Sequence, residues 1–306
     1  MHALAGGLSY FDLEFLGRPR VIAVAVARGA DGVALIDPGP STCLERLRAE
    51  LAAAGVTAAD IRSVLLTHIH LDHAGVAGTL VRENPEIEVY VHERGAPHMV
   101  DPARLLSSAA RLYGADMERL WGEFLPVPEA NIRVLQGGEQ VETGGRRFEV
   151  AYTPGHASHH VSYFDRAAGV AFVGDTAGVR TGQALFVMPP TPPPDIDVEV
   201  WMESIELIRR WRPATLFATH FGPHEDADAH LDAFLQHLAA LAELARGLLA
   251  EEEGDNERLR KFVHESRLYL QRHLPVEEVD LYDFAAPLTL GWLGLQRYWR
   301  KRGVGA

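Results

Sequence analysis

The segment from Thr67 to Gly75 constrains this chain more than any other part of the sequence. It reads Thr-His-Ile-His-Leu-Asp-His-Ala-Gly, so three imidazoles and one carboxylate stand close together. The preceding run, Ile61 to Leu66, predicts a buried strand. Alternate side chains of an extended segment share one face, so His68 and His70 can reach the same metal ion. Neutral imidazole and carboxylate suit zinc, and also iron or manganese.

The remaining polar groups of the segment, Asp72 and His73, come where the chain must turn and can be directed at a second point nearby. Three later apolar runs end in the same way, each with one group that can bind a metal: His156, Asp175 and His220. Strand ends that converge on one place form a pocket in a sheet protein. The alternative, a loop that is rich in histidine by chance, does not explain these three runs.

The pattern His-x-His-x-Asp-His, followed by separate His, Asp and His residues, resembles the metallo-β-lactamase-fold hydrolase superfamily. Asp37-Pro38-Gly39, which follows the apolar run 33–36, resembles the early Asp-x-Gly turn of that family. The resemblance spans roughly residues 21–222 and implies an α/β fold, the αββα metallo-β-lactamase-like sandwich of two sheets flanked by helices. It leaves the substrate open, because this scaffold carries many chemistries.

The resemblance also implies two divalent metal ions, of which zinc is expected and iron or manganese are alternatives. The implied ligands are His68, His70 and His156 at one ion, Asp72, His73 and His220 at the other, and Asp175 between them. A metal-bridging hydroxide then attacks the substrate, and Asp72 and Asp175 are the expected catalytic residues. His160 is expected to orient a ligand, with a pocket-lining or purely structural role as the alternative.

Composition narrows the class of partner. The net charge, 29 − 42 = −13, disfavours a nucleic-acid-binding surface. The single cysteine, Cys43, excludes an internal disulfide and is expected to be a packed small residue. No signal-peptide pattern is visible, and no apolar stretch reaches about 18 residues. We therefore expect a cytoplasmic protein with a small-molecule substrate and no membrane partner.

The pattern of apolar residues predicts a catalytic domain over 1–225 and a helical C-terminal region over 226–306 that packs on it. Residues 97–128 are expected to form a helical insertion, either packed on the core or acting as a lid. The proline-rich segment 189–194 is expected to be a pocket wall or a rigid connector. Further expected elements are strands 11–16 and 21–27, and helices 43–54, 74–84, 197–211, 229–252, 256–273 and 288–301.

The leading functional hypothesis is a dinuclear metal-dependent hydrolase of a small ester, lactone or thioester. The first alternative is a mononuclear iron persulfide dioxygenase, and the second is a binding protein with a structural metal site. The apolar and aromatic segment 288–302 is expected to pack on the catalytic domain or to form a homodimer, and to border the substrate pocket.

Overall fold

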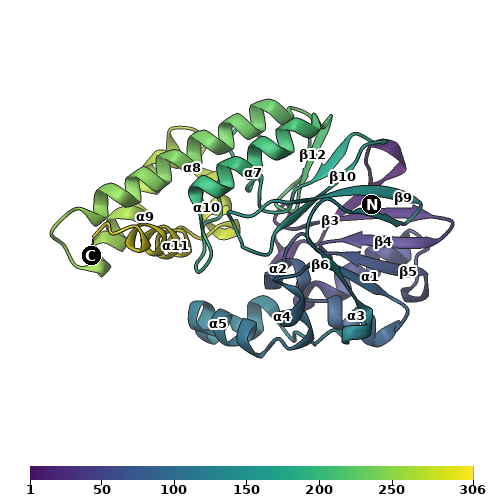
Figure 1. The fold of residues 1–306 in the computed structure, drawn as a ribbon. Coiled ribbons are helices and arrows are strands. Elements are labelled where there is room, and N and C mark those ends of the chain that lie inside the picture. The colour runs from purple at the N-terminus through teal and green to yellow at the C-terminus, as the bar shows by residue number, and fades with distance from the viewer. Residues whose placement is uncertain (306) are drawn as a thin grey trace.

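The computed structural model describes residues 1–305, and it has four layers: helices, a sheet, a second sheet and helices. Figure 1 shows the two sheets packed face to face, with α7 and α8 covering one and α1, α3 and α4 covering the other. The predicted αββα sandwich is therefore confirmed.

The first sheet contains seven strands in chain order, of which β4 to β7 are parallel and the others antiparallel. Its strands are β1 (His2–Ala3), β2 (Ser9–Asp12), β3 (Ala23–Gly29), β4 (Gly32–Ile36), β5 (Ile61–Leu65), β6 (Glu88–His92) and β7 (Ile132–Leu135).

The second sheet contains six strands in the order β13-β12-β11-β10-β9-β8, and only β11 and β12 are parallel. Its strands are β8 (Gln140–Thr143), β9 (Arg146–Tyr152), β10 (Val161–Asp165), β11 (Val170–Phe172), β12 (Thr215–Ala218) and β13 (Gly222–His224).

Strand β3 shows why the first sheet is buried on both faces. Ala23, Ala25 and Ala27 point towards the second sheet, whereas Val24 and Val26 point towards the helices. Side chains alternate between faces along a strand, so small residues recur on one face and branched residues on the other. The small face lets the two sheets approach closely, and the larger aromatic side chains of the second sheet fill the space between them.

The helices that lie between strands β4 and β7 of the first sheet include the expected insertion. They are α1 (Leu44–Ala53), α2 (Leu71–Ala74), α3 (Ala77–Glu83), α4 (Ala96–Val100), α5 (Ala103–Tyr113) and α6 (Met117–Trp121). Short 3-10 turns lie at Ala5–Gly7, Phe15–Gly17, Ser41–Cys43, Ala58–Asp60, Gly114–Asp116 and Glu129–Asn131. Cys43 is buried, as a packed small residue would be.

The C-terminal part is helical throughout, as expected, and joins one apolar core with α7 and the second sheet. Its helices are α8 (Ala227–Leu249), α9 (Asp255–Gln271), α10 (Val276–Ala285) and α11 (Leu288–Lys301), which follow α7 (Val198–Trp211). The division into domains at residue 225 stays a prediction. Within residues 1–305, no helix combines the length and the apolar character that crossing a membrane requires.

Some expected elements were placed wrongly. The strand expected over 11–16 is β2, which ends at Asp12, and a 3-10 turn at Phe15–Gly17 follows it. The single helix expected over 74–84 is two helices, α2 and α3, and α2 already begins within the histidine motif. The apolar spacing is continuous through this region, so it does not reveal where the helical backbone is interrupted.

Candidate metal centre

Each of the seven predicted ligands lies just beyond the end of a strand, where the two sheets meet. His68 and His70 follow β5, and helix α2 carries Asp72 and His73. The remaining ligands follow the second sheet's strands: His156 after β9, Asp175 after β11 and His220 after β12. The structure brings all seven into two adjacent groups, so strands from both sheets deliver side chains to one place.

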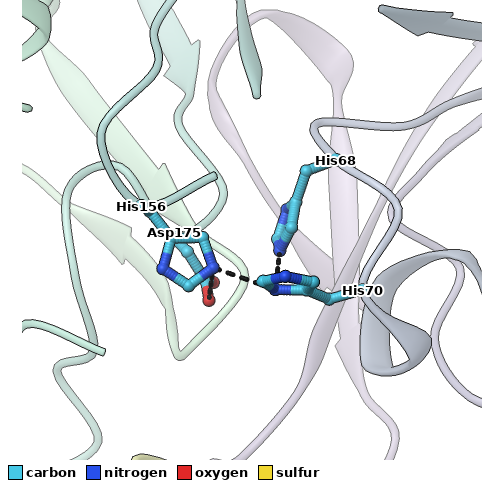
Figure 2. A group of neighbouring side chains, drawn as sticks. All are labelled: His68, His70, His156 and Asp175. Atoms are coloured by element: carbon cyan, nitrogen blue, oxygen red, sulfur yellow. Dashed lines mark hydrogen bonds and ion pairs between the residues drawn. The ribbon is translucent and has the colours of Figure 1, made fainter. Parts of the chain in front are cut away.

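The first group contains His68, His70, His156 and Asp175, and Figure 2 shows the His70 ring between those of His68 and His156. The His70 Nδ1 atom lies 2.9 Å from His68 Nε2 and 3.0 Å from His156 Nε2. His156 Nε2 lies 3.3 Å from Asp175 Oδ2. Ligands at ~2.1 Å from a tetrahedral zinc ion are about 3.4 Å apart, so this spacing approaches a metal-binding arrangement.

The second group contains Asp72, His73 and His220, and it faces the other oxygen of Asp175. Asp175 Oδ1 lies 3.2 Å from His73 Nε2 and 3.4 Å from His220 Nε2. His220 Nε2 also lies 3.3 Å from Asp72 Oδ2. The Asp175 carboxylate therefore borders both groups, one through each oxygen.

The donor atoms fit a cation. The buried atoms His73 Nε2 and Asp175 Oδ1 find no hydrogen-bond partner among residues 1–305. A buried polar atom without a partner is costly, and a cation between the two would satisfy both. These residues could hold two divalent metal ions, with Asp175 shared between them.

Hydrogen bonds on the far side of three rings fix which nitrogen faces the centre. The Nδ1 atom of His73 lies 2.8 Å from Asp37 Oδ2, and that of His156 lies 2.8 Å from the Pro190 carbonyl oxygen. The Nδ1 atom of His220 lies 2.6 Å from the carbonyl oxygen of Val21. When Nδ1–H donates to these oxygens, the Nε2 lone pair is left for a metal.

Burial and neighbouring charges separate the protonation states of these groups. Burial lowers the pKa of His70 to about 4 and lowers that of His68 well below its usual value. Burial would also lower the pKa of His73, but the carboxylates of Asp175, Asp37 and Asp72 outweigh it and raise that pKa. Neutral His68 and His70 are therefore ready to bind a metal, whereas His73 must give up a proton to do so.

The sequence identified Asp37 only as part of a turn and did not predict its contacts with the metal centre. Its carboxylate accepts hydrogen bonds from the Thr67 backbone N–H and Oγ1, at 2.8 and 2.7 Å, and from Thr219 Oγ1, at 2.8 Å. Together with His73, these contacts tie the ends of β4, β5 and β12 to one carboxylate. The Asp-Pro-Gly sequence indicated that Asp37 belongs to a family turn. It could not indicate the hydrogen-bond partners of Asp37, because they are distant in the chain.

His160 lies behind the metal ligands, which is the position that a residue orienting a ligand requires. Its ring is buried and contacts Thr153 Oγ1 and Thr176 Oγ1 at 3.1 and 3.0 Å, and its Nε2 accepts a hydrogen bond from the Asp175 backbone N–H at 3.3 Å. Gly174, at φ 48°, permits this close passage, because a Cβ there would lie 2.7 Å from His160 Nε2.

His159, the neighbour of His160, would point away from the site if this segment were extended, but it faces the cavity. Its ring centroid lies 5.6 Å from that of His70, and the residue lines the cavity. The segment after His156 is a turn rather than an extended strand, so the alternation of faces does not hold there.

The two groups open into a cavity of about 430 Å³. The insertion provides one wall, with Leu105, Leu112, Tyr113 and Trp121. The prolines of 190–194 provide another, together with the segment 285–291, which contains the end of α10, the short connection and the first turn of α11. The proline segment is therefore a pocket wall, and the C-terminal region borders the pocket as expected.

A third group of possible ligands, His224, Asp226 and His230, is already balanced by a cation of the chain. Arg180 Nη1 lies 2.7 and 2.9 Å from the two oxygens of Asp226. The guanidinium neutralises the only carboxylate of this group, so we interpret the group as an ion pair beside two histidines.

Comparison with known proteins agrees with this geometry. A family model described as the metallo-beta-lactamase superfamily matches residues 17–220, which is two thirds of the chain. The chain belongs to this superfamily. The expected family is thus confirmed, and the matched residues include all seven predicted ligands.

Superfamily relatives differ in how much of the chain they share. The metallo-beta-lactamase fold-containing protein ST1585 of Sulfurisphaera tokodaii is 28% identical over 162 residues, which cover 52% of this chain and 60% of that protein. A hydroxyacylglutathione hydrolase of Legionella pneumophila is 28% identical over 46% of this chain and 41% of its own length. This chain therefore matches only about half the length of these two relatives.

Solved structures share the fold more widely. The metallo-beta-lactamase family protein TTHA1429 from Thermus thermophilus superposes with a TM-score of 0.70 at 23% identity, over 92% of this chain and 89% of that chain. TTHA1623 in a di-iron-bound form is 26% identical, with a TM-score of 0.51 over 69% of this chain and 91% of that chain.

Proposed function

We propose that this protein is a metal-dependent hydrolase with a dinuclear centre that acts on a small ester, lactone or thioester. The observation that carries the proposal is the position of the Asp175 carboxylate. Its Oδ2 lies beside His156 of the first group, and its Oδ1 lies beside His73 and His220 of the second. One carboxylate between two complete sets of ligands is the arrangement that a pair of ions requires.

Two divalent ions held here would lower the pKa of bound water and stabilise the negative charge that develops on a carbonyl or phosphoryl oxygen. The chain supplies the remaining groups. His73 and His220 counter the effect of burial on Asp72 and lower its pKa to about 2, so its carboxylate is ionised at neutral pH. The Asp72 side chain is 23% exposed, so this carboxylate can orient a water molecule, or accept a proton from it and pass that proton to the leaving group.

Tyr113 supplies a hydrogen-bond donor in the same cavity. Burial and then the charges of Asp72 and Asp175 raise the pKa of its phenol, so the hydroxyl keeps its proton. A neutral hydroxyl can donate to a substrate oxygen. The ring packs edge-on against Trp121, with centroids 5.1 Å apart, which limits its movement.

The cavity and the relatives support an acyl substrate. Leucine and tryptophan side chains of the insertion give the cavity an apolar side that suits an acyl chain. Hydroxyacylglutathione hydrolases, named for a thioester substrate, are among the relatives of this chain. The di-iron form of TTHA1623 supports a pair of metals and includes iron beside zinc and manganese as candidates. We propose zinc as the native metal.

Elemental analysis of the purified protein, followed by a screen of lactones, thioesters, phosphodiesters and β-lactams, tests this function. We expect two ions per chain and turnover that a chelator abolishes and added metal restores. A single iron per chain with oxygen consumption on a persulfide would instead establish the dioxygenase alternative. A small-molecule substrate without nucleic-acid or membrane partners, a homodimer and a cytoplasmic location stay predictions.

A further inference from the structure

Helix α5 presents two kinds of side chain to the cavity. Leu105 and Leu112 are seven residues apart, and so are Arg104 and Arg111, with Ser108 between them. Seven residues make nearly two helical turns, so each pair returns to one side of the helix. An apolar stripe and a basic stripe therefore run side by side along the same wall.

Within the described residues 1–305, the basic stripe has no acidic side chain as a partner. Arg94, in the turn after β6, lines the same cavity as Arg104 and Arg111. Among residues 1–305, none of these three guanidinium groups has an acidic side chain within 4.0 Å. The Arg111 side chain reaches only Ser107 Oγ, at 3.4 Å, and Arg94 lies 5.9 Å from the ring centroid of Tyr152.

The acidic side chains of the cavity are engaged elsewhere. Asp72 and Asp175 belong to the candidate metal centre. Asp195 accepts hydrogen bonds from Ser158, with its Oδ2 2.5 Å from Ser158 Oγ. The chain as a whole has an excess of acidic residues, with a net charge of −13. Arginines without an acidic partner at its pocket therefore contrast with the charge of the rest of the protein. An anionic group of a bound molecule would supply the missing partner.

We infer that the substrate carries a carboxylate or a phosphate group in addition to the bond that is cleaved, and that Arg94, Arg104 and Arg111 bind this group. The inference rests on the proposed function and narrows its substrate class to anionic acyl compounds. The acyl chain packs on Leu105 and Leu112, and the anion lies on the neighbouring basic stripe of α5. These arginines are exposed at the rim, so they contribute to substrate affinity and to attraction at a distance.

Matched substrates that differ in one charge test the inference. One pair is the hexanoyl thioester of 3-mercaptopropionate and that of its amide, which places the carboxylate on the leaving group. A second pair, the adipoyl thioester of N-acetylcysteamine and its terminal amide, places the carboxylate on the acyl chain. A third pair, hexanoyl phosphopantetheine and hexanoyl pantetheine, tests phosphate. The measured quantity is the ratio of kcat/KM for the charged and the neutral member.

We expect this ratio to reach roughly tenfold for at least one pair, since a hydrogen bond to a charged group is roughly twice as strong as a neutral one, and the additional free energy corresponds to about a factor of ten in kcat/KM. The ratio should fall towards one in the triple variant Arg94→Gln, Arg104→Gln, Arg111→Gln, and it should decrease as salt screens exposed charges. Arg119→Gln is the control for loss of an arginine outside the cavity. It removes one positive charge, against three in the triple variant, from the insertion that also carries Arg104 and Arg111. Arg119 pairs with Asp116 away from the cavity, so this variant should keep the ratio of the wild type.

The inference is overturned if the wild type does not prefer the charged member of any pair, or if the preference survives in the triple variant. The proposed function fails in a different way, because no ester, lactone or thioester, charged or neutral, would then show metal-dependent turnover. A preference for the phosphate pair alone identifies phosphate as the recognised group, and a preference for a carboxylate pair alone identifies carboxylate.

Discussion

At the scale of single residues, Asp175 carries the most weight, because each of its oxygens faces a different group of ligands. We predict that Asp175→Ala lowers kcat/KM at least about 100-fold, since the stabilisation of developing charge depends on correctly placed groups. The fold should persist, because the residue follows β11 rather than filling the core. Kinetics, elemental analysis and circular dichroism of the variant measure these effects. Turnover like that of the wild type in a fully metal-loaded variant would contradict the assignment.

His230 tests how burial controls protonation away from the centre. It is fully buried, its Nε2 donates to the Ala177 carbonyl oxygen at 2.7 Å, and burial lowers its pKa to about 4. The unfolded chain binds a proton near pH 6.5 and the folded chain near pH 4, so this contribution to stability is complete above pH 6.5 and is lost as pH falls towards 4. A depression of this size corresponds to roughly 3 kcal/mol.

We therefore predict that His230→Gln, which keeps a donor for the Ala177 oxygen, loses less stability than the wild type between pH 7 and pH 4. Urea unfolding across this range gives the free energy of unfolding of both proteins. The difference between the two values at each pH removes the contribution of the other histidines. Parallel stability curves for the two proteins would show that His230 does not titrate in this way.

At the scale of elements, the contact between α11 and the proline segment links the C-terminal helices to the centre. A Cβ at Gly294 would lie 2.0 Å from the Thr191 carbonyl oxygen, and Thr191 Oγ1 donates to the Gly291 oxygen at 3.2 Å. The same segment supplies the Pro190 carbonyl oxygen that contacts His156 Nδ1. A change on α11 can therefore reach a metal ligand through only a few residues of backbone.

We predict that Gly294→Ala lowers the free energy of unfolding by about 1–3 kcal/mol, as overpacking does, and that it also raises KM. Gly247→Ala is the matched control, because it lies in helix α8 with open space around its Cβ position. That control should be neutral or stabilise by up to about 1 kcal/mol, because alanine favours a helix. Equal stabilities and kinetics for the two variants would exclude the proposed contact.

At the scale of the whole molecule, the centre joins the two sheets. His68, His70, Asp72 and His73 follow strand β5 of the first sheet, and the other ligands follow strands of the second. We predict that a chelator lowers Tm by on the order of 10 °C at neutral pH, since a ligand that binds only the folded state at 1,000 times its Kd stabilises by about 4 kcal/mol. Differential scanning calorimetry with and without metal measures the shift. Asp175→Ala should show a much smaller shift, and an unchanged Tm in the wild type would argue against metals that join the sheets.

The sequence by itself determined the features that depend on the spacing of neighbouring residues, namely single strands, single helices and the ligands of one motif. The apolar runs predicted β5 and the long helices α7, α9 and α11, and the runs that precede the candidate ligands identified the polar group at the end of each. The histidine motif identified four of the candidate ligands, because the neighbouring residues of one turn must share a region of space. Breaks within continuous apolar spacing, such as the one between α2 and α3, left no such signal.

Only the tertiary structure decided how the distant segments face one another. The four hydrogen bonds to Asp37, the turn that directs His159 into the cavity and the lack of an acidic partner for Arg94, Arg104 and Arg111 among residues 1–305 all depend on segments far apart in the chain. Local spacing fixes which side chains share a face, but it says nothing about what lies opposite that face. The partner across a cavity is set by the packing of the two sheets and of the helices that cover them, and that packing is a property of the whole chain.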